Sequence, residues 1–471
     1  MTMPSPMSAV AVATSIPPNL SRNNAGHRLD HEYQKVCIAS WFQCGFRVLS
    51  VNAASEIPQL KARYPDVVFV TAGRSGSLEP SKPLIADLLG ALAAASEPVL
   101  GIINSDIVFE PSSAWQERLP DLVEYAVVTG QRNDASSLLE GTFRKYYWGF
   151  DHFFFDHAAA HDLEANARNF AMGLAWWDYW LLACASFNGR NVVAVERPCV
   201  AHLIHKEPYL DAGWREMGLE FARFVDLRAR ERHGTVPPAI NPLLANCRAL
   251  ATMTNGMTGD GQIDMRISQL AVDYVPELTR NVVNLDRDRA VSKSATITEN
   301  GRLTPDNIFR KFEERLRAGE QLERAKRLER ENRLVEAEVD FRAAQAQTPR
   351  DFDLLYAFGE HLLRRRDYQH AADLLQKAAE QNPDSCRLMN SLAAALRALN
   401  RYAEAIACLE RAREAEPDDQ ATYCNIALTL NESGRRTDAI QILETALIKW
   451  PDFKAAAELK DRLCGRPHIV P

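Results

Sequence analysis

The stretch Gly101-Ile102-Ile103-Asn104-Ser105-Asp106-Ile107-Val108-Phe109 joins an apolar run to a polar tripeptide and then to a second apolar run. This pattern predicts a buried strand that ends at Asn104-Ser105-Asp106. In open α/β sheets, ligands bind outside the carboxyl ends of the strands. A carboxylate at that place can hold a divalent cation against a phosphate, because hard cations prefer oxygen ligands. The alternative is a turn in which Asp106 bonds only to local backbone.

Segments of two kinds alternate on the N-terminal side of this stretch. Runs rich in β-branched and aromatic residues alternate with helix-type runs that have proline near their start. This alternation predicts an α/β fold with a mostly parallel sheet and crossover helices. The predicted strands are residues 35–40, 46–51, 66–71 and 99–103, and the predicted helices are residues 55–64 and 83–95.

Composition restricts the class of protein. The length of 471 residues corresponds to about three domains. A net charge of -7 disfavours nucleic acid as the main partner. The nine cysteines are scattered without a CxxC pair, which is typical of a reduced chain and not of a disulfide framework or a zinc site.

Neither residues 1–30 nor the apolar runs of the chain have the pattern of a targeting or membrane-spanning segment. Residues 1–30 are rich in proline and serine and lack the basic start of a signal peptide, so we expect a disordered tail there. No run approaches the roughly 20 apolar residues of a membrane span. These features predict a cytoplasmic protein, with peripheral association with a membrane as an alternative.

The C-terminal third of the chain is periodic. Prolines recur every 34 residues, and three other positions keep the same phase, with alanine, a large apolar residue and alanine again. The recurring residues are Pro349, Pro383, Pro417 and Pro451; Ala337, Ala371, Ala405 and Ala439; Phe341, Leu375, Leu409 and Leu443; and Ala344, Ala378, Ala412 and Ala446. This helix-turn-helix pattern resembles the tetratricopeptide repeat (TPR).

The repeat divides the rest of the chain. We expect an all-α TPR solenoid with a capping helix at residues 305–463, a short tail at 464–471, and a connector at 236–304. The α/β domain then occupies residues 31–235. The resemblance implies that the repeats bind a peptide or protein partner in a concave groove, or associate with a second copy to form a homo-oligomer.

Three clusters in the α/β domain contain residue types suited to chemistry. They are Asn104-Ser105-Asp106, then Trp176-Trp177-Asp178, and then the pair His202 and His205. In this order they resemble the motifs of a GT-A type glycosyltransferase, over about residues 33–225. That family has a nucleotide-binding half that ends in an acidic motif, often Asp-x-Asp, followed by a later acidic residue that faces the acceptor and a histidine near the end of the domain.

The resemblance implies transfer of a sugar from a nucleotide-sugar donor, with a divalent metal ion, Mn²⁺ or Mg²⁺, offsetting charge on the leaving diphosphate. It assigns Asp106 and His202 or His205 to the metal, and Asp178 to the general base. The implied acceptor-binding residues are Trp176, Trp177 and Asp151, with Trp180 as a further aromatic. The implied donor-binding residues are Ser40, Trp41, Asn52, Lys82 (or Arg74), Asn104, Ser105 and Asp106.

Two departures from the family pattern keep alternatives open. Asn104 stands where the first Asp of Asp-x-Asp is expected, so the metal site is weak, or the enzyme is metal-independent, or catalysis has been lost. Asp178 is one acid where relatives often have two, and the alternative is a structural acid within a helix. The histidines can be ordinary core or surface residues, and Asp151 can shape a loop. The alternative function is therefore a non-catalytic TPR scaffold with a degenerate transferase fold.

Overall fold

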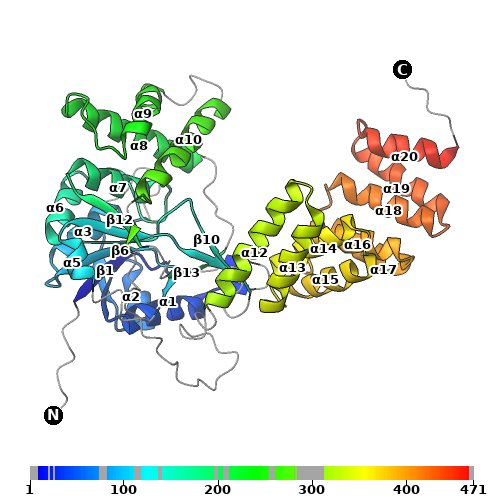
Figure 1. Ribbon diagram of the computed structural model, residues 1–471, viewed down its shortest axis with the longest axis horizontal. Helices are drawn as coiled ribbons and strands as arrows, with labels where there is room; N and C mark the ends of the chain where they lie inside the picture. Colours follow the sequence, from blue (N-terminus) through cyan, green and yellow to red (C-terminus); the bar gives the residue numbers. More distant parts are fainter. Residues whose placement is uncertain are drawn as a thin grey trace, which may run out of the picture. The chain divides into compact units, whose positions relative to one another are not determined.

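The computed structural model divides the chain into two compact units (Figure 1). The N-terminal unit holds nearly all of the chain up to Phe312, and the C-terminal unit holds Glu313–Pro471. The structure describes residues 9–19, 22–24, 27–73, 82–110, 118–135, 141–195, 200–204, 212–253, 260–280, 282–283 and 312–465. Within these residues, no helix combines the length and the apolar character needed to cross a membrane.

An eight-stranded sheet forms the centre of the N-terminal unit, in the order β14-β12-β8-β11-β6-β1-β4-β5. Neighbouring strands are parallel, except that β11 runs antiparallel to both β6 and β8. The prediction of an α/β region with a mostly parallel sheet is therefore confirmed. The strands are β1 (Val10–Thr14), β4 (Phe46–Asn52), β5 (Val68–Thr71), β6 (Val99–Ile103), β8 (Ala126–Gly130), β11 (His152–Phe155), β12 (Asn191–Val195) and β14 (Val282–Val283).

Strand β1 corrects the prediction that residues 1–30 form a disordered tail. All five residues of Val10–Thr14 are buried, and the strand lies between β4 and β6. Val12 pairs with Val48 on one side and with Gly101 on the other. A strand buried on both faces has no polar alternation, so this short apolar run among prolines and serines gave no periodic signal.

Residues 35–40 were predicted as a strand, and this prediction is wrong. They lie in helix α1 (His31–Gln43), whose N-cap Asp30 accepts a hydrogen bond of 2.9 Å from the backbone N–H of Glu32. The six-residue window contains β-branched residues but is too short to show the helical period. The buried positions Val36, Cys37 and Ser40 show that period in the structure.

A smaller sheet lies beside the carboxyl end of β6, in the order β10-β9-β13-β7. Its register places His202 opposite Ile107 on one side and opposite Asp134 on the other. Residues far apart in the sequence thus meet next to Asp106. The strands are β7 (Ile107–Phe109), β9 (Asn133–Ala135), β10 (Phe143–Lys145) and β13 (Val200–Leu203), and a separate two-stranded sheet contains β2 (Arg22–Asn24) and β3 (His27–Leu29).

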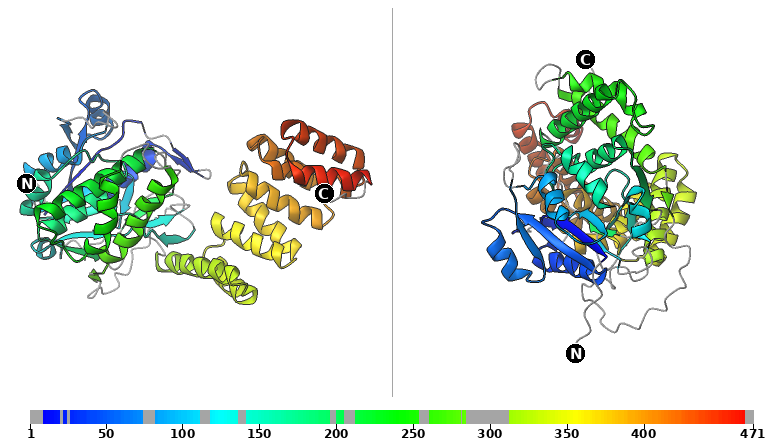
Figure 2. Two further views of the ribbon diagram at one scale, coloured as in Figure 1. Left: turned by 90° about the horizontal axis from the view of Figure 1, so that it is seen from above. Right: turned by 90° about the vertical axis from the view of Figure 1, so that its left-hand side faces the viewer.

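Helices cover the sheet of the N-terminal unit, with α8, α9 and α10 grouped on one side of it and α1 and α2 on the other (Figures 1 and 2). Besides α1 they are α2 (Ile57–Arg63), α3 (Ile85–Ala93), α5 (Leu119–Val123), α6 (His157–Ala165), α7 (Trp177–Phe187), α8 (Ala212–Glu231), the 3₁₀ helix Asn241–Leu243, α9 (Leu244–Ala251) and α10 (Asp260–Leu278).

The prediction of a connector at 236–304 is wrong for its described part up to Leu278. Helices α9 and α10 belong to the hydrophobic core of the N-terminal unit. On α10 the residues Ile263, Ile267, Leu270 and Tyr274 are fully buried, at helical spacing. The exposed side of α10 also carries apolar residues, Met265 and Val272, and this blurs the contrast between its two faces in the sequence.

The C-terminal unit is an all-helical solenoid of antiparallel helix pairs, as the periodicity predicted (Figure 2). The phased alanines and large apolar residues of all four repeats are buried. At Gly359 an added Cβ would lie 2.6 Å from Cγ of Leu375, so the two helices of that repeat approach closely because this position has no side chain. The helices are α12 (Phe312–Arg330), α13 (Leu334–Gln347), α14 (Phe352–Arg364), α15 (Tyr368–Gln381), α16 (Cys386–Ala398), α17 (Tyr402–Ala415), α18 (Gln420–Glu432), α19 (Arg436–Lys449) and α20 (Lys454–Cys464).

Candidate functional site

The strand order reverses at β1, because β4 lies on one side of it and β6 on the other. Open α/β sheets bind ligands at such a switch point, outside the carboxyl ends of the strands. A cavity of about 270 Å³ lies there. We call it the switch-point cavity, and its lining residues are Ser15, Pro17, Pro18, Asn52, Glu56, Lys82, Pro83, Asn104, Ser105, Asp106, Met172, Gly173, Leu174 and Trp177.

The polar groups of the switch-point cavity are held by neighbours. Asn52, at the end of β4, accepts a 2.6 Å hydrogen bond from the hydroxyl of Ser50 and donates one of 2.9 Å to the carbonyl of Ile16. Lys82 donates to the carbonyl of Gly173 across 2.9 Å, which fixes its ammonium group at the cavity. The cavity therefore presents one ammonium group, two side-chain amides and two carboxylates, those of Glu56 and Asp106.

A chain of charged side chains runs from Asp106 across the small sheet. Nε2 of His202 lies 3.6 Å from Oδ2 of Asp106, and its Nδ1 hydrogen-bonds to Oδ1 of Asp134 at 3.0 Å. Arg132 bridges Asp134 and Asp151, with both ion pairs at 2.7 Å. Asn104 completes the chain, since its side-chain amide donates to Asp151 and its backbone N–H donates to the carbonyl of the same residue at 2.8 Å.

These contacts set the protonation of the buried pair His202 and Asp134. Burial and the charge of Arg132 lower the pKa of His202, but the carboxylates of Asp106 and Asp134 outweigh them and raise that pKa to about 9. Burial works against ionisation of Asp134, yet the hydrogen bond from His202 and the charge of Arg132 lower its pKa below the usual value. In the absence of other ligands, a cationic imidazole therefore lies between two carboxylates.

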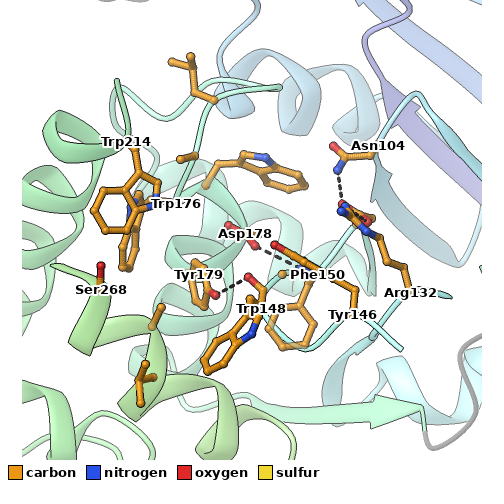
Figure 3. Close-up of a pocket in the computed structure, with 17 residues that line it drawn as sticks. Asn104, Arg132, Tyr146, Trp148, Phe150, Trp176, Asp178, Tyr179, Trp214 and Ser268 are labelled. Carbon is orange, nitrogen blue, oxygen red and sulfur yellow. Dashed lines mark hydrogen bonds and ion pairs between the residues drawn. The ribbon is translucent and has the colours of Figure 1, made fainter. Parts of the chain in front are cut away.

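A second cavity, of about 350 Å³, adjoins the first. The two share Asn104, Leu174 and Trp177 among their lining residues. Figure 3 shows Trp176 and Trp214 at one end of this cavity, Asn104 and Arg132 at the other, and Asp178 between them. We call it the aromatic cavity, and its lining residues are Asn104, Arg132, Tyr146, Trp148, Gly149, Phe150, Asp151, Leu174, Ala175, Trp176, Trp177, Asp178, Tyr179, Trp214, Ser268, Ala271 and Val272.

Asp178 lies in the first turn of α7, where the helix N-terminus favours a negative charge. Its Oδ2 accepts a hydrogen bond of 3.2 Å from the backbone N–H of Phe150. Trp176 is the N-cap residue of α7 and has a left-handed backbone conformation, with φ of 71°. Burial raises the pKa of Asp178 to about 7, although the N–H groups of Phe150 and Tyr179 act in the other direction. A carboxyl group of this kind can accept a proton near neutral pH.

Most of the residues predicted from sequence lie at one of the two cavities, but several do not. Ser40 and Trp41 are fully buried in α1 and hydrogen-bond to backbone of Phe109 and Ile107, so they fix β7 and cannot contact a nucleotide. Trp180 is also fully buried and stacks on Phe170 in the core. Arg74 and His205 lie outside the described residues.

The sequence did not single out Arg132, Asp134, Tyr146, Trp148 or Trp214. The aromatic run at residues 146–156 contained a usable signal for Tyr146 and Trp148, because such density indicates a core or a pocket. Arg132 and Asp134 carried none, since they lie in a short polar segment that reads as a loop. Only the pairing of β9 with β13 brings them to His202.

The metal prediction has a partial structural counterpart. Asp106 and His202 lie close together, and Asp134 orients the imidazole through the other ring nitrogen, as carboxylates commonly do for histidines that bind metals. Among the described residues, however, no three His, Cys, Asp or Glu side chains are grouped as a metal site would require. The described part of the site thus offers at most two protein ligands of these four residue types.

Comparison with known proteins bears on the C-terminal unit. Two tetratricopeptide repeat family models match, one at residues 322–385 and the other at residues 362–426 and 396–463. No curated protein matches the chain.

Among solved structures, the chain is similar to the crystal structure of YrrB, described as a TPR protein with an unusual peptide-binding site (20% identity, 33% of this chain and 79% of that chain, TM-score 0.30). It is also similar to MamA (17% identity, 30% and 82%, TM-score 0.28) and to the Arabidopsis OM64 TPR domain (18% identity, 24% and 94%, TM-score 0.23). These scores are too low to indicate a function. The family models and the phased helices together identify residues 322–463 as tetratricopeptide repeats, which serve protein interaction.

Proposed function

We propose that the N-terminal unit is a GT-A-like glycosyltransferase, which moves a sugar from a nucleotide-sugar donor to an acceptor, and that the TPR repeats hold a protein partner or the acceptor. The observation that supports this most is the pair of adjoining cavities. One lies at the switch point of the sheet with a carboxylate and a cation, and the other is aromatic with a carboxyl group whose pKa is near neutrality. Two substrates could meet at their shared residues.

In this proposal the switch-point cavity binds the donor. Asn52 is the last residue of β4, which lies beside β1 at the switch point, where nucleotides bind in open α/β sheets. Lys82 supplies a positive charge for the diphosphate, and Asn104 and Ser105 supply polar groups beside it. Asp106 and His202 would hold a divalent ion, which when bound would offset the charge that builds on the leaving diphosphate.

Asp178 then acts as the general base for an acceptor bound in the aromatic cavity. Its carboxylate takes the proton of an acceptor hydroxyl while the hydroxyl oxygen forms a bond to the anomeric carbon of the donor sugar. The bond from that carbon to the diphosphate oxygen breaks, and the nucleoside diphosphate leaves with the electron pair. A direct displacement of this kind inverts the anomeric centre.

Calorimetric titration of UDP and GDP tests the donor site, with and without Mn²⁺, on the wild type and on Lys82→Ala and Asp106→Ala. We expect one nucleotide to bind, and Lys82→Ala to weaken it at least about tenfold, a loss of about 1.4 kcal/mol. Tyr125→Ala is the matched control, because Tyr125 is 65% exposed and lines neither cavity. No binding of either nucleotide under any condition would contradict the proposal.

The second candidate is a TPR scaffold with a degenerate transferase fold. The observation behind it is Asn104, an amide at the position where the GT-A motif has a carboxylate. In that case the repeats are the working part, and they bind a peptide, a protein or a second copy of the chain. A location in the cytoplasm is part of both proposals, because the described cysteines are free thiols.

A further inference from the structure

The aromatic cavity has two chemically unlike ends. Trp214 lies at one end, backed by the almost fully buried Trp176 at a ring-centroid distance of 5.8 Å, and the polar groups of Asn104, Arg132 and Asp151 lie at the other end (Figure 3). We propose that this cavity is a saccharide-binding subsite, so that the acceptor is a sugar residue of a glycan or glycoconjugate. This inference rests on the proposed transferase function, which it makes more specific.

The two ends match the two kinds of surface on a pyranose ring. The C–H groups on a ring face carry partial positive charge and pack on the electron-rich face of an aromatic ring. The hydroxyl groups on the ring edge need hydrogen-bond partners, which the Asn104 and Arg132 end can provide. A purely apolar acceptor would remove water from Arg132, Asp151 and Asp178 without replacing its hydrogen bonds. The cavity volume of about 350 Å³ is near the lower limit for small-molecule sites, which suits one ring.

An exposed tryptophan, Trp148, lines this cavity. Its side chain is 50% exposed, so one face of its ring is open to a ligand there. Its backbone is fixed, because the hydroxyl of Tyr179 donates a 2.7 Å hydrogen bond to its carbonyl oxygen. Next to it, the guanidinium of Arg132 lies 4.3 Å from the ring centroid of Tyr146, which orients a second ring. A ring that is oriented in advance, as Tyr146 is by Arg132, loses little entropy when a ligand packs on it.

Helix α10 limits the size of the cavity with small side chains, Ser268, Ala271 and Val272. The helix is anchored to α8 by a bidentate ion pair between Arg215 and Asp264, with both contacts at 2.7 Å. The fully buried Ile267 and Leu270 also hold this helix in the core, so a large side chain at Ala271 would enter the cavity. This position gives a way to block the aromatic cavity without touching the switch-point cavity.

The test is binding of sugars in the absence of any donor. Saturation-transfer NMR of the full chain would use methyl β-glucoside, methyl β-galactoside and methyl N-acetyl-β-glucosaminide, with 1-octanol as the apolar probe. We expect at least one glycoside to bind, about tenfold weaker binding in Trp148→Ala, and loss of binding in Ala271→Trp. Tyr125→Ala should bind as the wild type does, and an unchanged far-ultraviolet circular dichroism spectrum and melting temperature would show that each variant is folded.

Each outcome assigns the failure to one proposal. Nucleotide binding without glycoside binding, or binding of octanol alone, overturns the saccharide inference and leaves the donor site intact. Glycoside binding that neither Trp148→Ala nor Ala271→Trp changes also overturns it, because the sugar would then bind elsewhere. Glycoside binding without nucleotide binding supports the subsite and refutes transfer. If neither class of ligand binds, both proposals fail.

Discussion

Replacing Asp178 by Asn tests whether burial of this carboxylate in its charged form lowers the stability of the folded protein. Burial raises its pKa from 3.8 to about 7, a shift of about 3 units, which at 1.36 kcal/mol per unit corresponds to about 4 kcal/mol. The folded state holds the proton more tightly than the unfolded state. The stabilising contribution is therefore complete below about pH 4 and is lost as the pH rises through about 7. Because solvent reaches Asp178 through the cavity, 4 kcal/mol is an upper limit.

Asparagine has the same shape, and its carbonyl oxygen can still accept the hydrogen bond from Phe150, but it does not ionise. We expect Asp178→Asn to be more stable than the wild type at pH 8, and this advantage to be about 2–3 kcal/mol smaller at pH 5. Urea denaturation followed by tryptophan fluorescence measures it. All eight tryptophans except Trp450 lie in the first 214 residues, so the signal reports mainly the N-terminal unit.

Asp264→Asn is the control variant, because its effect on stability should depend on pH in the opposite direction. The hydrogen bond from Arg215 lowers the pKa of Asp264, so its stabilising contribution is present above the unfolded pKa and is lost as the pH falls. That variant should lose stability relative to the wild type at pH 8, the opposite of Asp178→Asn. The reasoning would be refuted if the difference in free energy of unfolding between Asp178→Asn and the wild type were the same at pH 5 and pH 8. It would also be refuted if the variant were less stable than the wild type at pH 8. Under the proposed function it should also lose about 10²–10⁴-fold in transfer rate.

Three further outcomes are expected. Transfer catalysed by the wild type should rise with pH through about 7 and then level off, because the base must be ionised; a flat pH–rate profile between pH 5 and 9 would count against Asp178 in that role. Arg132→Met should lower the free energy of unfolding of the N-terminal unit by about 3–5 kcal/mol in urea titrations, because it leaves two buried carboxylates without their cation, and a loss below 1 kcal/mol would contradict this. Gly359→Ala should destabilise the repeats by about 1–3 kcal/mol in circular dichroism melts, because its Cβ meets Leu375 at 2.6 Å, whereas Gly213→Ala, with nothing within 4 Å, should be neutral or slightly stabilising.

The repeats could be predicted from sequence because their information is local and redundant. Each of four repeats places alanine, a large apolar residue and proline in the same phase, so any one repeat could be read with the help of the others. The sheet was predictable only in part. Strand β1 owes its existence to β4 and β6 on either side of it, and a five-residue apolar run does not reveal which neighbours it will have.

The same distinction separates the site residues that were found from those that were missed. Asp106 and Asp178 each stand in a local pattern, a carboxylate after an apolar run and a carboxylate among tryptophans. Arg132 and Asp134 become part of the site through the register of β9 and β13, which no local pattern encodes. Ser40 was assigned to the donor on the belief that its segment was a strand, and once that segment is a helix the residue turns into the core.

Asn104 shows why a departure from a motif has to be interpreted together with its neighbours. From the sequence alone, Asn104 suggests that a metal ligand has been lost, since an amide binds a metal ion more weakly than a carboxylate does. In the structure its side chain donates to Asp151, which also takes the charge of Arg132. An aspartate at 104 could not donate there and would place a second negative charge against Asp151. The amide therefore belongs to a network that joins the two cavities, and its presence does not by itself indicate a degenerate site.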